Sequence, residues 1–416
     1  MNPDPNKKMF ASLTLFVAIV LLPALRSPAL DWPQWRGPNR DGISLEAGWS
    51  TNWPKEGLKE LWKAEIGTGY GSVAVSQGRL FVMGNAAEQD TVYCLDASTG
   101  KEIWKHTYAC AAKDPSWYHG TRCTPSVDGD RVYTVSRQGH LFCLAAATGQ
   151  VKWARNFTND FRAQVPFYGY ALSLLVEGEF VIVEPAAPGA SVVAFDKHSG
   201  KMVWQAGSDP ASFSSPVAFD LNGERCVVVF TAAGPVGRRV KDGTELWRYV
   251  WKTNPEIHAA TPIVQGSRIF ISSGYGAGCA LIDVSATPPK TIWKNKKMRN
   301  HFSTCVLWKG HLYGFDETTL KCLDFATGEV KWEEKKYGKG TLMAADGKLL
   351  VYSQRGQLGL VEATPASYKE LAFIQAIQLR AEYPGKAEKQ TWAVPVLANG
   401  RIYCRSQNDL VCLDVH

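Results

Sequence analysis

The chain has 416 residues, of which 45% are hydrophobic and 20% are charged, and its formal net charge is +7. This apolar fraction excludes a disordered chain, and the mild, dispersed basic excess is unlike the clustered charge of a nucleic-acid-binding protein. Length alone would suggest two or more domains, because single hydrophobic cores stop growing near about 250–300 residues. Fifteen tryptophans are many for one chain, and their positions indicate the organisation.

The first 29 residues have the pattern of an export signal. Lys7 and Lys8 precede an apolar run at 10–22, and small residues follow at 27–29. The run is too short for a comfortable membrane span. We therefore expect a cleaved signal peptide at 1–29 and a mature protein that is exported, periplasmic or secreted, without an integral membrane span. The alternative is an uncleaved anchor.

One eleven-residue pattern recurs along the interior of the chain. It is clearest at 94–104 and returns, with small changes, at 143–153, 194–204 and 322–332. Shortened or interrupted copies follow residues 242, 281 and 360, and a last one starts at Cys412. Each copy follows a short alternating segment that is typical of a β-strand after a tight turn.

The repeated unit places a tryptophan near the end of its last strand. With one strand that precedes the first unit, these positions are Trp62, Trp104, Trp153, Trp204, Trp247, Trp293 and Trp332. A flat indole can cover the turn of the adjoining unit, and the glycine four residues before most of these tryptophans suits a tight turn and close approach. We interpret all seven as structural docking residues because they recur once per unit.

The spacing of these tryptophans, 39 to 51 residues, is typical of four-stranded propeller blades. Seven units are complete, and the eighth, at 393–416, lacks its last strand. The segment 58–63 can supply it and remove an open sheet edge. We predict an all-β fold: an eight-bladed β-propeller of four-stranded antiparallel blades over 58–416, closed by an N-terminal strand completing the last blade.

The eleven-residue unit A-x-D-x-x-T-G-x-x-x-W resembles the tryptophan-docking motif of quinoprotein alcohol dehydrogenases. The opening DWPQWRGPNRDG at 31–42 is similar to the start of secreted bacterial pyrroloquinoline-quinone-like β-propeller repeat proteins. The whole chain is also similar to the propeller lipoprotein of the outer-membrane β-barrel assembly machinery. The resemblance of the repeated unit covers 58–416 and implies a propeller, but fold alone does not fix function.

The ten cysteines do not form an obvious disulfide framework. Cys94, Cys143, Cys322 and Cys412 occupy one repeated position, so they should lie too far apart to pair and should act as small buried hydrophobic residues. Cys110 and Cys123 flank one long loop and are the candidate disulfide.

No metal site is expected from sequence motifs. The chain has no H-E-x-x-H, no paired C-x-x-C and no EF-hand loop. It also lacks the adjacent cysteine pair common in quinoprotein alcohol dehydrogenases, an identifiable set of acidic calcium ligands with a catalytic aspartate, and a lipid-attachment cysteine before Cys94.

Long connections at 106–120, 156–169, 294–301 and 375–391 should lie on one face of the ring, where function is expected. Residues just before each innermost strand should surround the channel mouth there, and Arg355 should face the same side. The candidate ligand-binding residues are Tyr70, Arg122, Tyr168, Tyr170, Phe213, His258, His301, Lys339, Arg355 and Trp392.

This set is aromatic and basic without a carboxylate, which favours a small anionic or planar ligand. The alternative is that the aromatic rings merely plug the channel and the histidines bond to nearby backbone. Glu184 should face the same side as Arg355, and a glutamate beside a cation could act as a base, but structural pairing is the simpler interpretation.

Two other segments stand out. The region 30–57 carries Trp32, Trp35, Trp49 and Trp53, which would staple the segment over the propeller or form an exposed partner-binding patch. The run 290–299 is rich in lysine, as expected of a solvated strand and loop or of a surface for an acidic partner or a membrane.

Two functions from different classes follow. The first is a non-catalytic ligand- or protein-binding scaffold propeller of the bacterial cell envelope, whose partner is an envelope protein or a small anionic or planar ligand. The second, implied by the resemblance, is a pyrroloquinoline-quinone-dependent alcohol or sugar dehydrogenase with calcium. The residues themselves assign no catalytic group and no cofactor.

Overall fold

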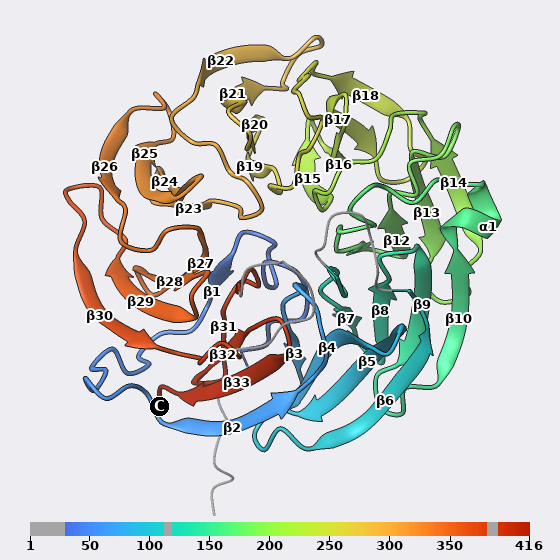
Figure 1. The fold of residues 1–416 in the computed structure, drawn as a ribbon. Helices are drawn as coiled ribbons and strands as arrows, with labels where there is room; N and C mark the ends of the chain where they lie inside the picture. Colours follow the sequence, from blue (N-terminus) through green and yellow to red (C-terminus); the bar gives the residue numbers. More distant parts are fainter. Residues whose placement is uncertain (1–29, 112–118, 381–389) are drawn as a thin grey trace, which may run out of the picture.

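Eight antiparallel sheets stand radially around one axis in the computed structural model, which describes residues 30–111, 119–380 and 390–416 (Figure 1). The predicted signal peptide at 1–29 lies outside the described residues. Each sheet is one blade, and its strands follow one another from the axis outwards. This arrangement confirms the predicted eight-bladed, all-β propeller.

The first four blades follow the chain in order. Blade one has β3 (Ala74–Ser76), β4 (Arg79–Ala86), β5 (Gln89–Asp96) and β6 (Glu102–Ala109). Blade two has β7 (Ser126–Asp128), β8 (Arg131–Val135), β9 (His140–Ala145) and β10 (Val151–Asn156), and a short helix, α1 (Phe157–Phe161), follows it. Blade three has β11 (Leu175–Glu177), β12 (Phe180–Val183), β13 (Val192–Asp196) and β14 (Met202–Ala206). Blade four has β15 (Val217–Leu221), β16 (Glu224–Thr231), β17 (Gly234–Arg239) and β18 (Glu245–Arg248).

The remaining blades include the two strands from the N-terminal region. Blade five has β19 (Ile263–Gln265), β20 (Arg268–Ser273), β21 (Gly278–Asp283) and β22 (Lys290–Asn295). Blade six has β23 (Val306–Trp308), β24 (His311–Asp316), β25 (Thr319–Asp324) and β26 (Val330–Glu334). Blade seven has β27 (Gly340–Ala345), β28 (Lys348–Ser353), β29 (Gln357–Glu362), β30 (Glu370–Gln375) and the added β1 (Ile43–Ser44). Blade eight has β31 (Val396–Ala398), β32 (Arg401–Arg405), β33 (Asp409–Asp414) and β2 (Glu60–Glu65).

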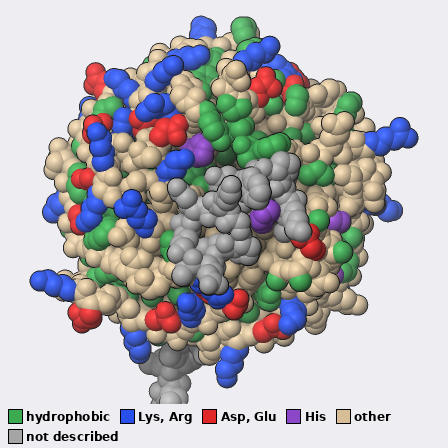
Figure 2. Space-filling model, in the orientation of Figure 1, with side chains coloured by type: hydrophobic (Ala, Val, Ile, Leu, Met, Phe, Trp, Pro, Cys, Tyr) green, Lys and Arg blue, Asp and Glu red, His purple; other side chains and the backbone are tan. Residues whose placement is uncertain are grey.

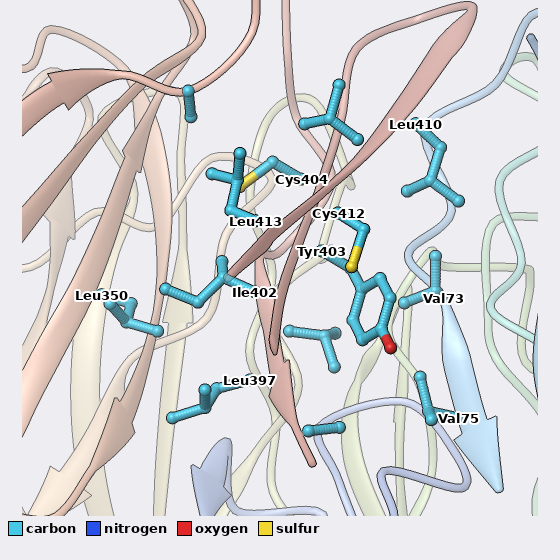
Figure 3. Close-up of a cluster of buried hydrophobic side chains, with 14 of the residues drawn as sticks. Val73, Val75, Leu350, Leu397, Ile402, Tyr403, Cys404, Leu410, Cys412 and Leu413 are labelled. Carbon is cyan, nitrogen blue, oxygen red and sulfur yellow. The ribbon is translucent and has the colours of Figure 1, made fainter. Parts of the chain in front are cut away.

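The middle strands of each blade are buried on both faces because neighbouring blades pack against them. On β32, Ile402 faces blade seven near Leu350, whereas Tyr403 faces Val75 of blade one (Figure 3). Successive side chains therefore feed two different inter-blade cores, as the two-residue period of a strand requires. The outer strands alternate buried and exposed side chains because they have one solvated face.

The ring closes between β2 and β33. These strands pair antiparallel, with Trp62 opposite Cys412, so the predicted closure by the N-terminal strand is confirmed. In Figure 1 the blue β2 lies beside the red β33 at the rim of the ring.

The repeated tryptophans dock onto the turn of the next blade. Trp104 Nε1 donates to the carbonyl of Ala146 at 2.9 Å, and a Cβ built on Gly149 would lie 2.5 Å from the indole. Gly149 also has φ +73°, so glycine is required there by both space and backbone conformation. The same pair of contacts, to a glycine and to the carbonyl three residues before it, is made by Trp62, Trp153, Trp204 and Trp293.

Trp332 keeps only the hydrogen bond, to the carbonyl of Thr364. Trp247 is the exception among the seven: it is buried over Gly237 of its own blade, and its Nε1 has no acceptor among the described residues. The turn of blade five that follows β21 lacks the glycine because extra residues are inserted there.

Hydroxyl groups join neighbouring blades near the axis. Thr124 Oγ1 accepts from the backbone of Ser72, Ser173 Oγ accepts from the backbone of Thr124, and Ser215 Oγ accepts from the backbone of Ser173, all at 2.9–3.0 Å. Thr304 does the same for Thr261. Neighbouring blades are thus joined by hydroxyl groups near the axis and by indole rings near the rim.

The first part of the described N-terminal region lies inside the ring instead of over it. We call residues 31–44 the N-terminal plug. Its β1 pairs parallel with β27 of blade seven, and Trp32 bridges Val75 of blade one. Figure 1 shows this blue segment crossing the centre of the ring. The plug thus lies inside the ring instead of over its surface, whereas Trp49 is buried and Trp53 packs against the buried cluster that joins blades seven, eight and one, as predicted for a staple.

Two arginines of the plug point into the walls of the channel. Arg36 donates to the carbonyl of Cys305 in blade six, and Arg40 donates to the carbonyl of Leu174 next to blade three. Burial lowers the pKa of both guanidinium groups to about 10. They remain charged at neutral pH and hold the plug to opposite sides of the ring.

The predicted disulfide is not present: Cys110 and Cys123 are both buried free thiols, as are the other eight cysteines. Cys123 Sγ donates to the carbonyl of Thr124, and Cys110 lies beside Asp90. Each thiol packs in its own polar contact, so a shared flanking loop does not bring the two sulfurs together. The four cysteines of the repeat position are fully buried, as expected.

None of the described helices is long and apolar enough to cross a membrane.

The closure can be tested through Trp62, which joins the last blade to the first. We expect Trp62→Ala to cost about 3–5 kcal/mol of stability, because a buried indole is lost. Trp62→Phe should cost about 1 kcal/mol if the ring still packs and only the hydrogen bond is lost. Urea unfolding measures both, with the exposed Leu45→Ala as control. An unchanged stability in Trp62→Ala would contradict docking at the closure.

Candidate functional site

A cavity of about 400 Å³ opens at the mouth of the channel, on the face of the long connections. All eight blades and the plug contribute side chains to it. Its described lining consists of Trp35, Tyr70, Arg122, Tyr168, Ala171, Ser173, Phe213, Ser215, Ile257, Ala259, Tyr275, His301, Phe302, Lys339 and Trp392. Seven of the ten predicted binding residues are in this set: Tyr70, Arg122, Tyr168, Phe213, His301, Lys339 and Trp392.

One wall is a continuous arc of five rings. Tyr70 contacts Trp392 at a centroid distance of 5.3 Å, and Trp392 stacks on Phe302 at 4.6 Å with an interplanar angle of 22°. Phe302 then meets His301 at 5.7 Å, and His301 meets Tyr275 at 4.7 Å. Because these rings support one another, the wall is held in a fixed shape.

The opposite wall is lower and mixed. Tyr168 and Phe213 meet edge to face at 5.6 Å, and the small residues Ala171, Ser173 and Ser215 lie beside them. Small side chains leave open the space that a flat ligand would need between the two walls.

Two cations stand at separate points of the lining. The guanidinium of Arg122 lies 5.5 Å from the centre of the Tyr70 ring. Lys339 Nζ lies 3.4 Å from His301 Nδ1, so the imidazole accepts from the ammonium. Burial, with the charge of Lys339, lowers the pKa of His301 to about 4. The described lining includes no carboxylate, and Arg122 and Lys339 give it positive charge.

The plug contributes a side chain to the pocket. Trp35 lines the cavity, and its Nε1 donates to Thr261 Oγ1 of blade five at 3.0 Å. Trp35 of the plug is therefore held in place as part of the boundary of the pocket.

Three predicted binding residues do not reach the pocket. Tyr170 is buried, donates to the carbonyl of Pro185 and packs edge to face on Phe157. Arg355 is exposed in the turn between β28 and β29. His258 is fully buried and stacks on Phe230 at 4.5 Å.

Glu184 does not meet Arg355 in an acid–base pair. It is buried, its Oε1 has no hydrogen-bond partner among the described residues, and burial raises its pKa well above the ordinary value. Burial thus disfavours the ionised form of this carboxyl, and the geometry gives no support to an acid–base pair with Arg355.

The sequence did not indicate Trp35, Tyr275 and Phe302 as lining residues. Phe302 follows a predicted residue directly, and its apolar character next to His301 was a usable signal. Tyr275 lies in the turn after β20. It could have been predicted as a lining residue only by recognising that this turn lies on the same face as the channel mouth. Trp35 had no such signal, because its place depends on how the plug crosses the ring.

The donor set for calcium is missing from the described lining. No group of three or more His, Cys, Asp or Glu side chains that could hold a metal occurs within 30–111, 119–380 and 390–416. The aromatic arc and the two cations would fit a planar, anionic quinone, but they offer a calcium ion only repulsion.

His258 provides a pH-dependent test of the structure. Ser273 Oγ accepts from Trp251 and lies 2.8 Å from His258 Nδ1, while Nε2 faces the carbonyl of Ala232, so a neutral ring satisfies every partner. Burial lowers the pKa of His258 to about 4. The unfolded chain takes up the proton first, so stability should fall as the pH drops from about 6.5 towards 4.

We expect His258→Gln to lose less stability than the wild type between pH 7 and pH 5, by about 2 kcal/mol. Urea unfolding at both pH values measures the difference, with the exposed His198→Gln as control. Equal pH dependence in wild type and His258→Gln would contradict a buried neutral imidazole.

Comparisons with known proteins agree with this architecture. A family profile described as outer membrane protein assembly factor BamB matches residues 49–115 and 112–334. The outer membrane protein assembly factor BamB of Burkholderia pseudomallei (strain K96243) is 24% identical over 257 residues, which are 58% of this chain and 59% of that protein. Quinohemoprotein alcohol dehydrogenase ADH IIB of Pseudomonas putida is 28% identical over 123 residues, or 27% of this chain and 17% of that enzyme. The chain thus spans less than two thirds of the length of either relative.

Solved structures share the fold at low identity. BamB from Moraxella catarrhalis superposes with a TM-score of 0.61 at 16% identity, covering 86% of this chain and 97% of that one. A europium-containing methanol dehydrogenase superposes with a TM-score of 0.68 at 12% identity, covering 92% and 98%. Because the profile matches more than half of the sequence, this chain belongs to the family described as outer membrane protein assembly factor BamB.

Proposed function

We propose that this protein is a non-catalytic binding propeller of the bacterial cell envelope whose channel-mouth pocket holds a planar, negatively charged group. The observation that carries the proposal is the aromatic and cationic lining of the pocket at the channel mouth. Trp35 lines a site that is walled by stacked rings and bears two cations. Such a site binds by stacking and charge.

The chemistry of the lining supports binding over catalysis. A general base works best with a pKa near the operating pH. His301 has a pKa lowered to about 4, and it already accepts from Lys339. The described lining therefore offers a weak proton acceptor and no carboxylate.

The envelope location is supported by the predicted export signal and by the family. The family profile and the relative from Burkholderia pseudomallei are named as outer membrane protein assembly factor. We propose by that likeness that this chain also acts beside a partner protein, with the rigid ring as its scaffold.

Binding can be measured by calorimetry with a panel of aromatic mono- and dicarboxylates. Arg122→Gln and Lys339→Gln should each weaken the affinity roughly tenfold or more, because a hydrogen bond to a charged group is worth about 1.5–3 kcal/mol. Trp392→Ala should weaken it by loss of stacking. Arg355→Gln is the matched control, because that arginine lies outside the pocket lining. Binding that is unaffected by the pocket variants would place the ligand elsewhere.

A quinone-dependent dehydrogenase is the second candidate, favoured by the match to a quinohemoprotein alcohol dehydrogenase and by the planar, cationic pocket. A bound quinone would supply the electron acceptor, and Arg122 and Lys339 would hold its carboxylates. The described residues provide no calcium donor set.

We expect pyrroloquinoline quinone to bind without calcium dependence and without turnover. Calorimetry with and without calcium, and dye-linked oxidation of alcohols and sugars, measure these two properties. Calcium-dependent turnover would overturn the non-catalytic proposal, and the Lys339→Gln variant would then show whether it occurs in this pocket.

A further inference from the structure

Beside the pocket lies a stretch of chain with unbalanced positive charge. Residues 284–315 contain no Asp or Glu. Within it, Lys290, Lys294, Lys296 and Lys297 are exposed, and we call these four residues the lysine strip. None of them has a carboxylate partner among the described residues. Arg299, which follows them, differs because both its Nε and Nη2 bind Asp316.

Other outer strands carry lysines that have a carboxylate partner. Lys105 on β6 bridges Glu102 at 3.2 Å, and Lys331 on β26 lies 3.8 Å from Glu329. Lysines on exposed edge strands commonly prevent pairing with another sheet. That role alone does not explain why Asp and Glu are absent from residues 284–315. The lysine strip therefore has charge available for a partner.

The strip leads to the pocket. Lys290 and Lys294 belong to β22, the outer edge strand of blade five, and Lys296 and Lys297 follow in the loop towards His301. Lys294 Nζ lies 4.5 Å from the Trp251 ring, and the side chain of Lys296 lies against Gly278 at the start of β21.

Tyr275 joins the strip to the aromatic arc. It is 45% exposed, lines the cavity and contacts His301, and it stands three residues before Gly278, against which the side chain of Lys296 lies. In Figure 2, Lys and Arg side chains gather over the part of the ring where Figure 1 places β22.

An extended polypeptide fits this shape better than a lipid surface. The strip spans eight residues, or about 25 Å at the rise of a strand, and it ends at a cavity of about 400 Å³ that takes one planar group. A membrane would engage lysines across a plane and would leave such a cavity unused.

We infer that the lysine strip and the pocket together bind an acidic, extended polypeptide segment that places one aromatic side chain in the pocket. Acidic side chains lie along Lys290, Lys294, Lys296 and Lys297, and the aromatic ring enters between the arc and Tyr168. This inference rests on the proposed function of the pocket, and it adds the class of partner.

The experiment uses the full chain and synthetic peptides of about twelve residues, rich in Asp and Glu, with one tryptophan near one end. Calorimetry compares this peptide with two matched ones, in which the tryptophan is alanine or the acids are amides. The protein variant is the double reversal Lys296→Glu, Lys297→Glu. Its control is Lys201→Glu, Lys241→Glu, which makes the same change of charge at exposed positions on blades three and four.

We expect the Lys296→Glu, Lys297→Glu variant to weaken binding of the acidic tryptophan peptide about tenfold or more at ~0.1 M salt, with a smaller effect at higher salt. The control variant should stay within about twofold. Both matched peptides should bind more weakly to the wild type, and Trp392→Ala should remove the advantage of the tryptophan.

Three outcomes would overturn the inference. If the strip variant binds the peptide as the wild type does, while small aromatic anions still occupy the pocket, the partner is wrong and the proposed function stands. If neither the peptide nor the small anions bind, both proposals fail. If vesicles of anionic phospholipid bind through the lysine strip and the peptide does not, the surface faces a membrane.

Discussion

The contact between an indole and a glycine turn is the interaction on which the ring depends. A blade cannot bury both of its faces alone, and it gains a partner only if the next blade stands at a fixed angle. Trp104 sets that angle by lying on Gly149 and donating to Ala146. The glycine contributes by having no side chain, and its left-handed backbone ends the turn where the indole arrives.

A ring of blades held in this way has a channel at its centre, and the N-terminal plug occupies part of that channel. The plug places there a short parallel strand, a tryptophan and two buried arginines that donate to backbone carbonyls on opposite walls. Such buried charge is costly unless hydrogen bonded, so the arginines specify one seating of the plug. The seated plug in turn brings Trp35 to the boundary of the pocket.

The repeat predicted the blades, the closure and seven of the residues that line the pocket, because each depends on a pattern that is local and recurs. What it missed depends on contacts between distant segments. Ile257 and Ala259 line the pocket while His258 between them points into the blade, so an offset of one residue in a strand-like segment reverses the side that a side chain faces.

Other errors have equally specific causes. Gly169, with φ +75°, interrupts the strand-like alternation between Tyr168 and Tyr170, and only Tyr168 lines the pocket. Trp247 of blade four has the expected spacing, but the turn after β21 in blade five, onto which it would dock, lacks the glycine. Trp35 could be assigned only with the path of the plug in view. These are properties of the assembled ring, which a pattern within one repeat does not contain.

The pairing of β2 with β33 joins residues 60 and 413, which are 353 positions apart. Strand β2, which is synthesised early, must therefore wait for the last strand of the chain. Closing so long a loop is slow relative to pairing within a blade, because the chain loses its conformational entropy before the contacts between β2 and β33 form. Until then blade eight lacks its outer strand, and the incomplete ring presents an unpaired edge. The same closure that covers the sheet edge in the finished molecule thus leaves that edge unpaired until the last folding step. During that period a chaperone or a partner protein would find the edge of blade eight accessible.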